Sequence, residues 1–380
     1  MLVLLASCLA LQAPLIQPPR LRTILGNGAV VLIERDASSK QLSVQLFVSA
    51  QDSPETPSTH GLRHLMEHLE APGRDGTLDR RVEARGGFIT AQTLRDATVF
   101  SLSLRPSDLE FGLRSMSEIM ELGPVGHDDI SREAAIIRQE QALERSPEKL
   151  SEAAWEAAYG DQGLDPSGNP DVIAAATPEQ VAKLHRDSFQ GRNLVLVIKG
   201  DVDLDAATAA GSEILKSSPS GPPPVFKMRE GHAGKASADT AGEARGALVT
   251  DFNSVQTAAR LAAALGIASE LEGAFVTYTP SQRGGLILIG ISGGAQDLAQ
   301  RIDKIVPARI EAIGRTLALR WVDRQIGSAS NGFMRGLLLV QGAGVQPETM
   351  IQNLKDMRSD DFAKGFQAFR SPNAVEVPGR

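Results

Sequence analysis

Short runs of alternating apolar and polar residues recur along the chain, a two-residue period that is typical of strands in antiparallel sheets. The first two runs flank Asn27-Gly28, a dipeptide that favours a tight hairpin turn. Further strands are predicted at 42–49, 90–104 and 194–201, and helices at about 107–121, at about 128–158 and from 178 onward. This mixture predicts an α+β fold in which each mostly antiparallel sheet has helices packed on one side.

Two halves with this pattern are separated by a stretch from 217 to 246, which is rich in Pro, Gly, Ala, Ser and Thr and is typical of a linker. Beyond it, strands are predicted at 247–251 and 285–292. The run F-x-x-x-N-x-V-x-V occurs at 189–197 and again at 369–377, each time after a predicted helix. The sequence therefore predicts two related domains, at 20–216 and 247–380.

The first fifteen residues are almost wholly apolar. Such a stretch is too short to span a bilayer and is typical of the apolar region of a secretory signal. We therefore expect an exported protein that is periplasmic, secreted or membrane-anchored. The run Leu-Ala-Ser-Cys at 5–8 resembles a lipoprotein cleavage site, so a lipid anchor at Cys8 is one interpretation. The alternative is that Cys8 is an incidental small residue of the signal.

Composition narrows the possible functions. The chain has 380 residues, a length that favours two domains. Its formal net charge is −7, which argues against a nucleic-acid partner because phosphate binding needs a basic surface. Cys8 is the only cysteine, so internal disulfides and cysteine-based zinc sites are excluded.

The candidate chemistry centres on residues 64–68, which read His-Leu-Met-Glu-His. Two histidines four residues apart lie on one face of a helix, so both imidazoles can reach a single ion. Glu67 lies beside them, where a carboxylate can take a proton from metal-bound water. The H-x-x-E-H order is the inverted zinc-peptidase signature. The alternative is a solvated helix face without an ion, but an apolar stripe at 62, 65, 66 and 69 predicts that one side of this helix is buried.

A catalytic zinc ion usually takes three protein ligands and a water molecule, so one further ligand is needed. The predicted helix at 128–158 carries several carboxylates: Glu133, Glu140, Glu144 and Glu148. Glu133 and Glu140 lie two turns apart, on a face that Ile136 and Ile137 are expected to bury. Because any one of these carboxylates could be a solvated surface charge, spacing alone leaves the third ligand open.

Four segments carry a resemblance to a known family. Residues 61–68 resemble the motif G-x-x-H-F-L-E-H, 86–93 resemble G-G-x-x-N-A-x-T, 133–140 resemble E-R-x-x-V-x-x-E, and 193–201 resemble N-L-x-L-V-V-x-G-D. These are motifs of the M16 metallopeptidases, the family of pitrilysin, insulin-degrading enzyme and the mitochondrial processing peptidase. The resemblance is specific over 20–205 and only general over 245–380.

The resemblance implies two α+β domains that close on each other like a clam, and one zinc ion held by His64, His68 and Glu140. Glu67 would be the general base, and Glu133 would orient a metal ligand. The segment from Gly87 to Thr93 would be an exposed edge strand that holds substrate by backbone pairing, as in β-augmentation. The residues of this strand expected to bind substrate are Gly87, Phe88, Ile89, Thr90 and Ala91. The implied activity is zinc-dependent endopeptidase cleavage of extended or unfolded peptides.

The sequence also departs from the family pattern. Thr90 replaces the family's Asn, and the stretch between 256 and 267 looks shortened. The Arg and Tyr that family members carry in the C-terminal domain are replaced by Ser269 and Val276, although Tyr278 and Arg283 are close enough in sequence to substitute. A second hypothesis follows, in which the chain is a zinc-bearing or non-hydrolytic subunit that needs a second M16-like chain. A homodimer is a further possibility.

Overall fold

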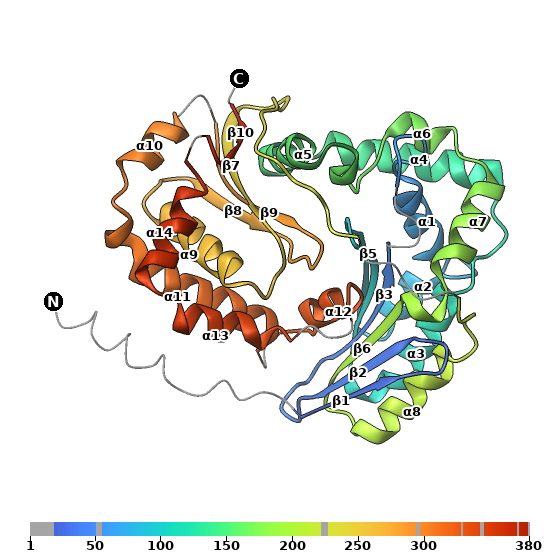
Figure 1. Ribbon diagram of the computed structural model, residues 1–380. Helices are drawn as coiled ribbons and strands as arrows, with labels where there is room; N and C mark the ends of the chain where they lie inside the picture. Colours follow the sequence, from blue (N-terminus) through green and yellow to red (C-terminus); the bar gives the residue numbers. More distant parts are fainter. Residues whose placement is uncertain are drawn as a thin grey trace.

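The computed structural model describes residues 19–50, 55–221, 227–293, 297–327, 330–342, 346–370 and 372–378. The predicted leader and Cys8 lie outside the described residues. Two β-sheets, each covered by helices, form the two halves of the chain (Figure 1). The predicted α+β class, with two mostly antiparallel sheets, is confirmed. Among the described residues, we find no helix that is both long enough and apolar enough to span a membrane.

The first sheet has the strand order β1-β2-β6-β3-β5-β4. Its strands are β1 (Arg20–Ile24), β2 (Val30–Arg35), β3 (Leu42–Ser49), β4 (Phe88–Thr93), β5 (Ala97–Leu104) and β6 (Leu194–Gly200). Neighbouring strands are antiparallel except for the parallel pair β2–β6. The alternating run predicted at 90–104 is thus a hairpin, β4–β5, that turns at Arg95-Asp96, and β4 is an edge strand.

Seven helices of the described residues pack on the first sheet or on one another beside it. They are α1 (Leu62–Glu70), α2 (Leu78–Glu83), α3 (Leu109–Ile119), α4 (His127–Ala142), α6 (Pro170–Ala174), α7 (Pro178–Ser188) and α8 (Leu204–Leu215). Leu113 and Met116 of α3 are buried with Val44 and Leu46 of β3 in a core that α8 also closes. A second cluster joins α1, α4, α6 and α7, so that the helix bearing the histidines is held by other helices.

The second sheet has the order β10-β7-β9-β8 and is antiparallel throughout. Its strands are β7 (Gly242–Val249), β8 (Ala274–Tyr278), β9 (Gly285–Ser292) and β10 (Val375–Val377). Its helices are α9 (Val255–Ser269), α10 (Leu298–Lys304), α11 (Pro307–Ile326), α13 (Glu348–Asp356) and α14 (Ser359–Gln367). The alanine-rich α9 packs against both α11 and α14, since small side chains let the helices approach closely.

The two halves repeat one topology. In the first half, the strands β6-β3-β5-β4 are neighbours in that order, and in the second half β10-β7-β9-β8 are neighbours in the same order. Helix α1 follows β3 as α9 follows β7, and the strands β6 and β10 each follow a helix and a buried phenylalanine, Phe189 or Phe369. The repeated sequence run therefore marks a repeated helix–turn–strand unit.

Each half also lends a helix to the other sheet (Figure 1). Helix α5 (Ser146–Tyr159) belongs to the first half in sequence but packs on β7, β9 and β10. Helix α12 (Phe333–Leu339) belongs to the second half but packs on β3 and β6. Gly336 of α12 faces the ring of Phe47, where a Cβ atom would collide with that ring. This exchange was not apparent from the sequence.

Two sequence-based expectations need correction. The helix predicted at 128–158 is broken between α4 and α5, because Pro147 begins a new helix in its first turn. Residues 242–246, assigned to the linker, are part of β7, where pairing with β9 compensates for their small number of apolar side chains. The stretch at 256–267, which looks shortened relative to the family, lies within helix α9.

Candidate metal centre

Helix α1 places the two histidines at the boundary between core and solvent. Leu62, Leu65 and Met66 are buried and anchor one side of the helix. The helix starts after Gly61, which has a φ of 100°, a left-handed conformation that glycine adopts without strain. A Cβ atom at Gly61 would lie 2.6 Å from Ile173 Cδ1, so a larger residue would also displace the neighbouring α6.

The Nδ1 atoms of the two histidines each have an acceptor. His64 Nδ1 lies 3.0 Å from the carbonyl oxygen of Ser167, and His68 Nδ1 lies 3.3 Å from Glu133 Oε2. A carbonyl or carboxylate oxygen can only accept, so both Nδ1 atoms carry the hydrogen. The Nε2 lone pairs of both rings are then free to bind an ion.

Both Nε2 atoms face the same carboxylate. Glu140 Oε2 lies 3.6 Å from His64 Nε2 and 3.4 Å from His68 Nε2. These separations exceed ordinary hydrogen-bond lengths. They match the spacing of about 3.3–3.6 Å expected between ligand atoms that each lie about 2.0–2.2 Å from a tetrahedral zinc ion. Among the described residues, these three form a cluster whose ligand atoms lie within 4.8 Å of one another.

Glu140 is the solvent-exposed member of the group. Its side chain is 51% exposed, whereas that of His64 is 13% exposed. Ile130 and Ile137 of α4 are buried against α1, and this packing sets the position of Glu140 on the same helix. Ile136, by contrast, is 40% exposed, so the expectation that it helps bury this face is wrong. The exposed carboxylate leaves a route by which an ion and a substrate can enter.

Glu67 is buried beside the histidines and accepts a hydrogen bond from Thr93 Oγ1 at 2.7 Å. Burial raises the pKa of Glu67 above its usual range, against the lowering effects of the Thr93 hydrogen bond and of His64. A carboxylate with a raised pKa is better able to accept a proton near neutral pH. Thr93 ends the edge strand β4, so the same strand contacts Glu67 and presents the open edge of the sheet.

Comparisons with known proteins point to a family of peptidases. Residues 30–167 match the family model described as Insulinase (Peptidase family M16). An uncharacterized zinc protease of Mycobacterium leprae is 26% identical over 215 residues, which are 53% of this chain and 48% of that protein. Residues 30–167 therefore belong to peptidase family M16. The mitochondrial-processing peptidase subunit beta of Blastocladiella emersonii is 26% identical over 192 residues, which are 48% of this chain and 41% of that subunit.

Solved structures share the whole fold of this M16 chain. A protease from Helicobacter pylori matches with a TM-score of 0.78 at 17% identity, over 95% of this chain and 99% of that one. A putative M16-like peptidase from Alicyclobacillus acidocaldarius matches with a TM-score of 0.75 at 17% identity, over 97% and 98% of the two chains. The curated relatives, in contrast, are matched over about half of their length or less.

A cavity of about 310 Å³ lies next to the histidines of this M16 protein and is lined from both halves. His64 and Thr93 line it from the first half, and Tyr278 lines it from the second. Arg283, the other possible substitute in the C-terminal half, instead pairs with Asp96 at 3.5 Å and donates to the carbonyl of Lys227. The structure therefore brings Tyr278, but not Arg283, to the cavity at the candidate site.

The two remaining carboxylates that the sequence offered as ligands, Glu144 and Glu148, lie near the site but do not contact a ring nitrogen of His64 or His68. Glu144 falls in the break after α4 and Glu148 lies on α5, and both line the cavity beside His64. Glu152 joins them there and pairs with Arg95. Burial raises the pKa of Glu152 to about 7, and the positive charge of Arg95 opposes this rise. Glu152 was not predicted from the sequence, because α5 reaches this place only through its packing on the second sheet.

Proposed function

We propose that this M16 chain is a zinc-dependent endopeptidase that cleaves extended or unfolded peptides. The observation that carries the proposal is the convergence of His64 Nε2, His68 Nε2 and Glu140 Oε2, with both Nδ1 atoms already committed to acceptors. His64, His68 and Glu140 would hold the ion, and Glu133 would orient His68. Zinc in this position would act as a Lewis acid that promotes ionisation of a water molecule and polarises the scissile carbonyl.

Glu67 is the proposed general base. Its carboxylate would take a proton from the attacking water and return it to the departing amine, which needs a proton to leave as a neutral group. Thr93 fixes the carboxylate by donating to Oε2, so that the other oxygen remains available for the proton. The raised pKa of Glu67, caused by burial, supports this role.

The edge strand β4 is the proposed binding site for the peptide backbone. Leu94 donates its backbone N–H to Ala97 at the hairpin turn, so the alternation of an antiparallel ladder directs the N–H groups of Ile89, Ala91 and Thr93 to the open edge. An extended peptide could pair with these groups, whereas a folded protein offers no free strand. This pairing would explain selectivity for unfolded substrates.

Replacing Glu67 with Gln tests the mechanism. We expect the wild-type protein to bind about one zinc ion and to cleave an unstructured peptide. The Glu67→Gln variant should bind zinc equally but cleave at least about a hundredfold more slowly, because an amide cannot accept the proton. His127→Gln, at the exposed start of α4, is the matched control and should retain full activity. Unchanged cleavage by Glu67→Gln, or a purified protein without zinc affinity, would refute the proposal.

A second candidate function is that of one subunit in a two-chain peptidase. Two observations favour it: the relative named above is a beta subunit, and Ser269 and Val276 stand where family members carry Arg and Tyr. In that case the chain alone would bind zinc without cleaving peptides, and a co-purified second M16 chain would restore cleavage.

The proposed location outside the cytoplasm, based on residues 1–15, is tested by fractionating cells that produce the full-length chain.

A further inference from the structure

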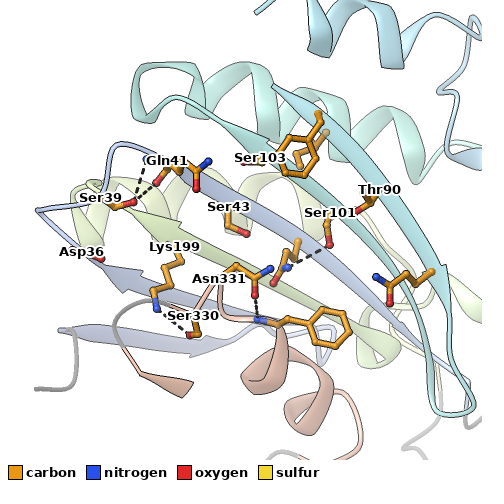
Figure 2. Close-up of a pocket in the computed structure, with 15 residues that line it drawn as sticks. Asp36, Ser39, Gln41, Ser43, Thr90, Ser101, Ser103, Lys199, Ser330 and Asn331 are labelled. Carbon is orange, nitrogen blue, oxygen red and sulfur yellow. Dashed lines mark hydrogen bonds between the residues drawn. The ribbon is translucent and has the colours of Figure 1, made fainter. Parts of the chain in front are cut away.

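A second cavity, of about 300 Å³, lies on the face of the first sheet opposite the helices α3 and α8 (Figure 2). Its floor consists of hydroxyl and amide side chains from β3 and β5, and Phe88, Thr90 and Gln92 of β4 form its rim. Phe333, at the start of α12, closes one side. The cavity thus adjoins the edge strand proposed to bind peptide, but it lies on the other side of that strand from Glu67.

The floor contains a buried polar atom without a partner. Gln45 is 1% exposed, and its Oε1 atom has no hydrogen-bond partner among the described residues. Its Nε2 atom donates to Ser101 Oγ at 3.3 Å. Because the Ser101 oxygen accepts this bond, its own hydrogen is free to be donated elsewhere. A buried amide oxygen without a partner costs about 1–3 kcal/mol, so such groups are usually satisfied by water or a ligand.

Gln45 and Ser101 therefore present one acceptor and one donor side by side. Turning the Gln45 amide over exchanges the two roles and still leaves one donor and one acceptor. A primary carboxamide offers the complementary pair, a carbonyl oxygen and an NH₂ group. Carboxylates can only accept and ammonium or guanidinium groups can only donate, so neither matches both positions.

The charged groups of the cavity are already paired. Lys199 Nζ lies 3.7 Å from Glu34 Oε2 and donates to Gly327 O and to Ser330 Oγ. Figure 2 shows the bond to Ser330. Glu34 also pairs with Arg335 at 2.6 Å. Asp36 lies at the far end of the cavity lining, where it accepts hydrogen bonds from Ser38. The floor near Gln45 thus has no free charge to recognise an ionic side chain.

A peptide bound along β4 would bring side chains to this cavity. Successive side chains of a strand point to opposite faces, so alternate residues of the peptide would lie on the face of Thr90 and Gln92. Thr93, which contacts Glu67, is three positions from Thr90, or about 10 Å along the strand. The side chain that reaches the cavity would belong to a residue about three positions from the cleaved bond.

We infer that this cavity is a specificity pocket for an uncharged carboxamide side chain, glutamine or asparagine, of the bound peptide. The inference deepens the proposed function and rests on peptide binding at β4. A glutamine side chain can hydrogen-bond to both Gln45 and Ser101, whereas a leucine side chain cannot. An apolar side chain would bury the Gln45 carbonyl unpaired, and we therefore expect about tenfold weaker binding of leucine peptides.

Peptide binding to the Glu67→Gln variant tests this pocket without cleavage. The probes are fluorescein-labelled unstructured peptides of one constant sequence, in which glutamine, leucine, lysine or glutamate is stepped through each position, and anisotropy reports affinity. At one position we expect glutamine to bind about tenfold more tightly than leucine, lysine or glutamate. Adding Gln45→Leu should reduce the difference between glutamine and leucine to less than about twofold.

Two further variants keep the test decisive. Ser101→Ala removes the hydroxyl partner on the half-buried floor and should reduce the same preference if Gln45→Leu does not fold. Gln352→Leu, the same exchange on the exposed part of α13, should leave the preference intact. Equal or tighter binding of leucine peptides, a glutamine preference that survives both pocket variants, or no peptide binding would overturn the inference. If the wild-type protein cleaves peptides without this selectivity, the pocket inference is overturned and the proposed peptidase activity stands. If peptides bind selectively but are not cleaved, the peptidase proposal is overturned and the pocket inference stands.

Discussion

The Nδ1 atoms of His64 and His68 donate to chemically different acceptors. His64 is oriented by the main-chain carbonyl of Ser167, and His68 by the carboxylate of Glu133. A carboxylate partner increases the electron density of an imidazole more than a neutral carbonyl does, which makes it a better metal ligand. Glu133 is 8% exposed, so this interaction is weakly screened by solvent.

Replacing Glu133 with Gln should weaken zinc binding about 10- to 100-fold, because the amide keeps an acceptor for His68 but loses the negative charge. Zinc affinity is measured by competition with a chromophoric chelator, and circular dichroism verifies that the fold is retained. Glu148→Gln is the matched control: this residue lines the cavity beside His64 and pairs with Arg145 at 3.0 Å, and its replacement should leave zinc affinity unchanged. Equal zinc affinity of wild type and Glu133→Gln would show that Glu133 has no such role.

At the scale of single residues, the sequence identified the side chains but not their partners. His64, Glu67 and His68 are close in sequence, and the family motif selected Glu140 from several carboxylates. Ser167 contributes a main-chain oxygen from a loop, which no side-chain pattern reveals. That loop approaches α1 only because Gly168 and Gly61 are in contact there, a tertiary property of two glycines far apart in sequence.

At the scale of elements, the two faces and the open edge of β4 have separate roles. Thr93 points toward Glu67, Thr90 toward the polar cavity of Figure 2, and the main chain of Ala91 toward the edge. Periodicity predicts such alternation, but it does not show which strand is at the edge. The order of strands depends on pairing between segments such as β3 and β6 that are distant in sequence.

An Ala91→Pro substitution should prevent peptide binding while preserving the fold. Proline removes the one N–H group that faces the open edge at this position, and edge strands tolerate proline. Thr90→Pro is the contrasting control, because the N–H of Thr90 points into the β4–β5 ladder and its loss should destabilise the hairpin. Anisotropy of a labelled unstructured peptide measures binding, and thermal unfolding measures stability. Full peptide binding by a folded Ala91→Pro variant would exclude β4 as the binding edge.

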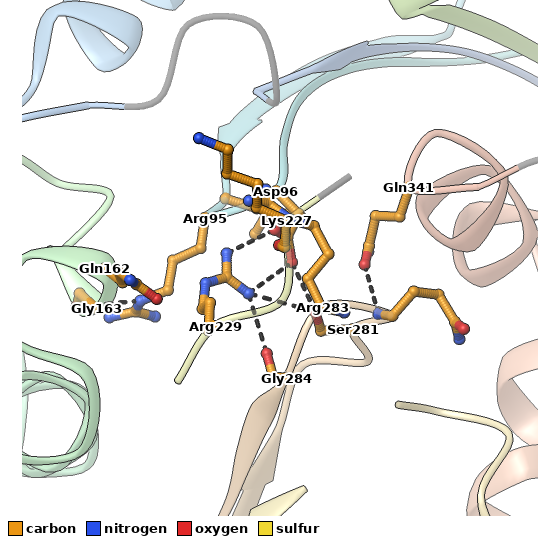
Figure 3. A network of polar contacts seen from close by, with 12 residues as sticks. Arg95, Asp96, Gln162, Gly163, Lys227, Arg229, Ser281, Arg283, Gly284 and Gln341 are labelled. Atoms are coloured by element: carbon orange, nitrogen blue, oxygen red, sulfur yellow. Dashed lines mark hydrogen bonds and ion pairs between the residues drawn. The ribbon is translucent and has the colours of Figure 1, made fainter. Parts of the chain in front are cut away.

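At the scale of the whole molecule, two buried ionic networks connect the halves in addition to the exchanged helices α5 and α12. In one network, Arg335 of α12 pairs with Glu34 of the first sheet at 2.6 Å. In the other, Asp96 at the β4–β5 turn pairs with Arg229 at 2.6 Å and accepts a hydrogen bond from Ser281 (Figure 3). The sequence indicated two related halves but not these connections, because each joins residues more than a hundred positions apart.

Asp96 lies in the turn after β4, whose last residue, Thr93, donates a hydrogen bond to Glu67. The network of Asp96 therefore holds the second half against the candidate site. The side chains of Asp96 and Arg229 are each 6% exposed. Removing one partner of a buried pair leaves the other charge uncompensated, at a cost of about 3–5 kcal/mol. We therefore expect Asp96→Asn to lower the free energy of unfolding by about 3 kcal/mol at pH 7. Asp187→Asn, which removes a solvent-exposed partner of Lys183, is the control and should have little effect.

The pH dependence of this loss separates the ionic contribution of Asp96 from a packing defect. Burial alone would raise the pKa of Asp96, but Arg229, Arg283 and Ser281 together outweigh it and lower the pKa below its usual range. A group with a lowered folded-state pKa stabilises the fold fully above its unfolded pKa of about 3.9, and this contribution is lost as pH falls through the lower folded-state value. Denaturant unfolding of wild type and Asp96→Asn should therefore differ most above about pH 5. The difference should shrink below about pH 3.9 and disappear only beneath the lowered folded-state pKa of Asp96. A difference that stays constant across this range would mean that the substitution acts through packing, and that the carboxylate charge does not connect the halves.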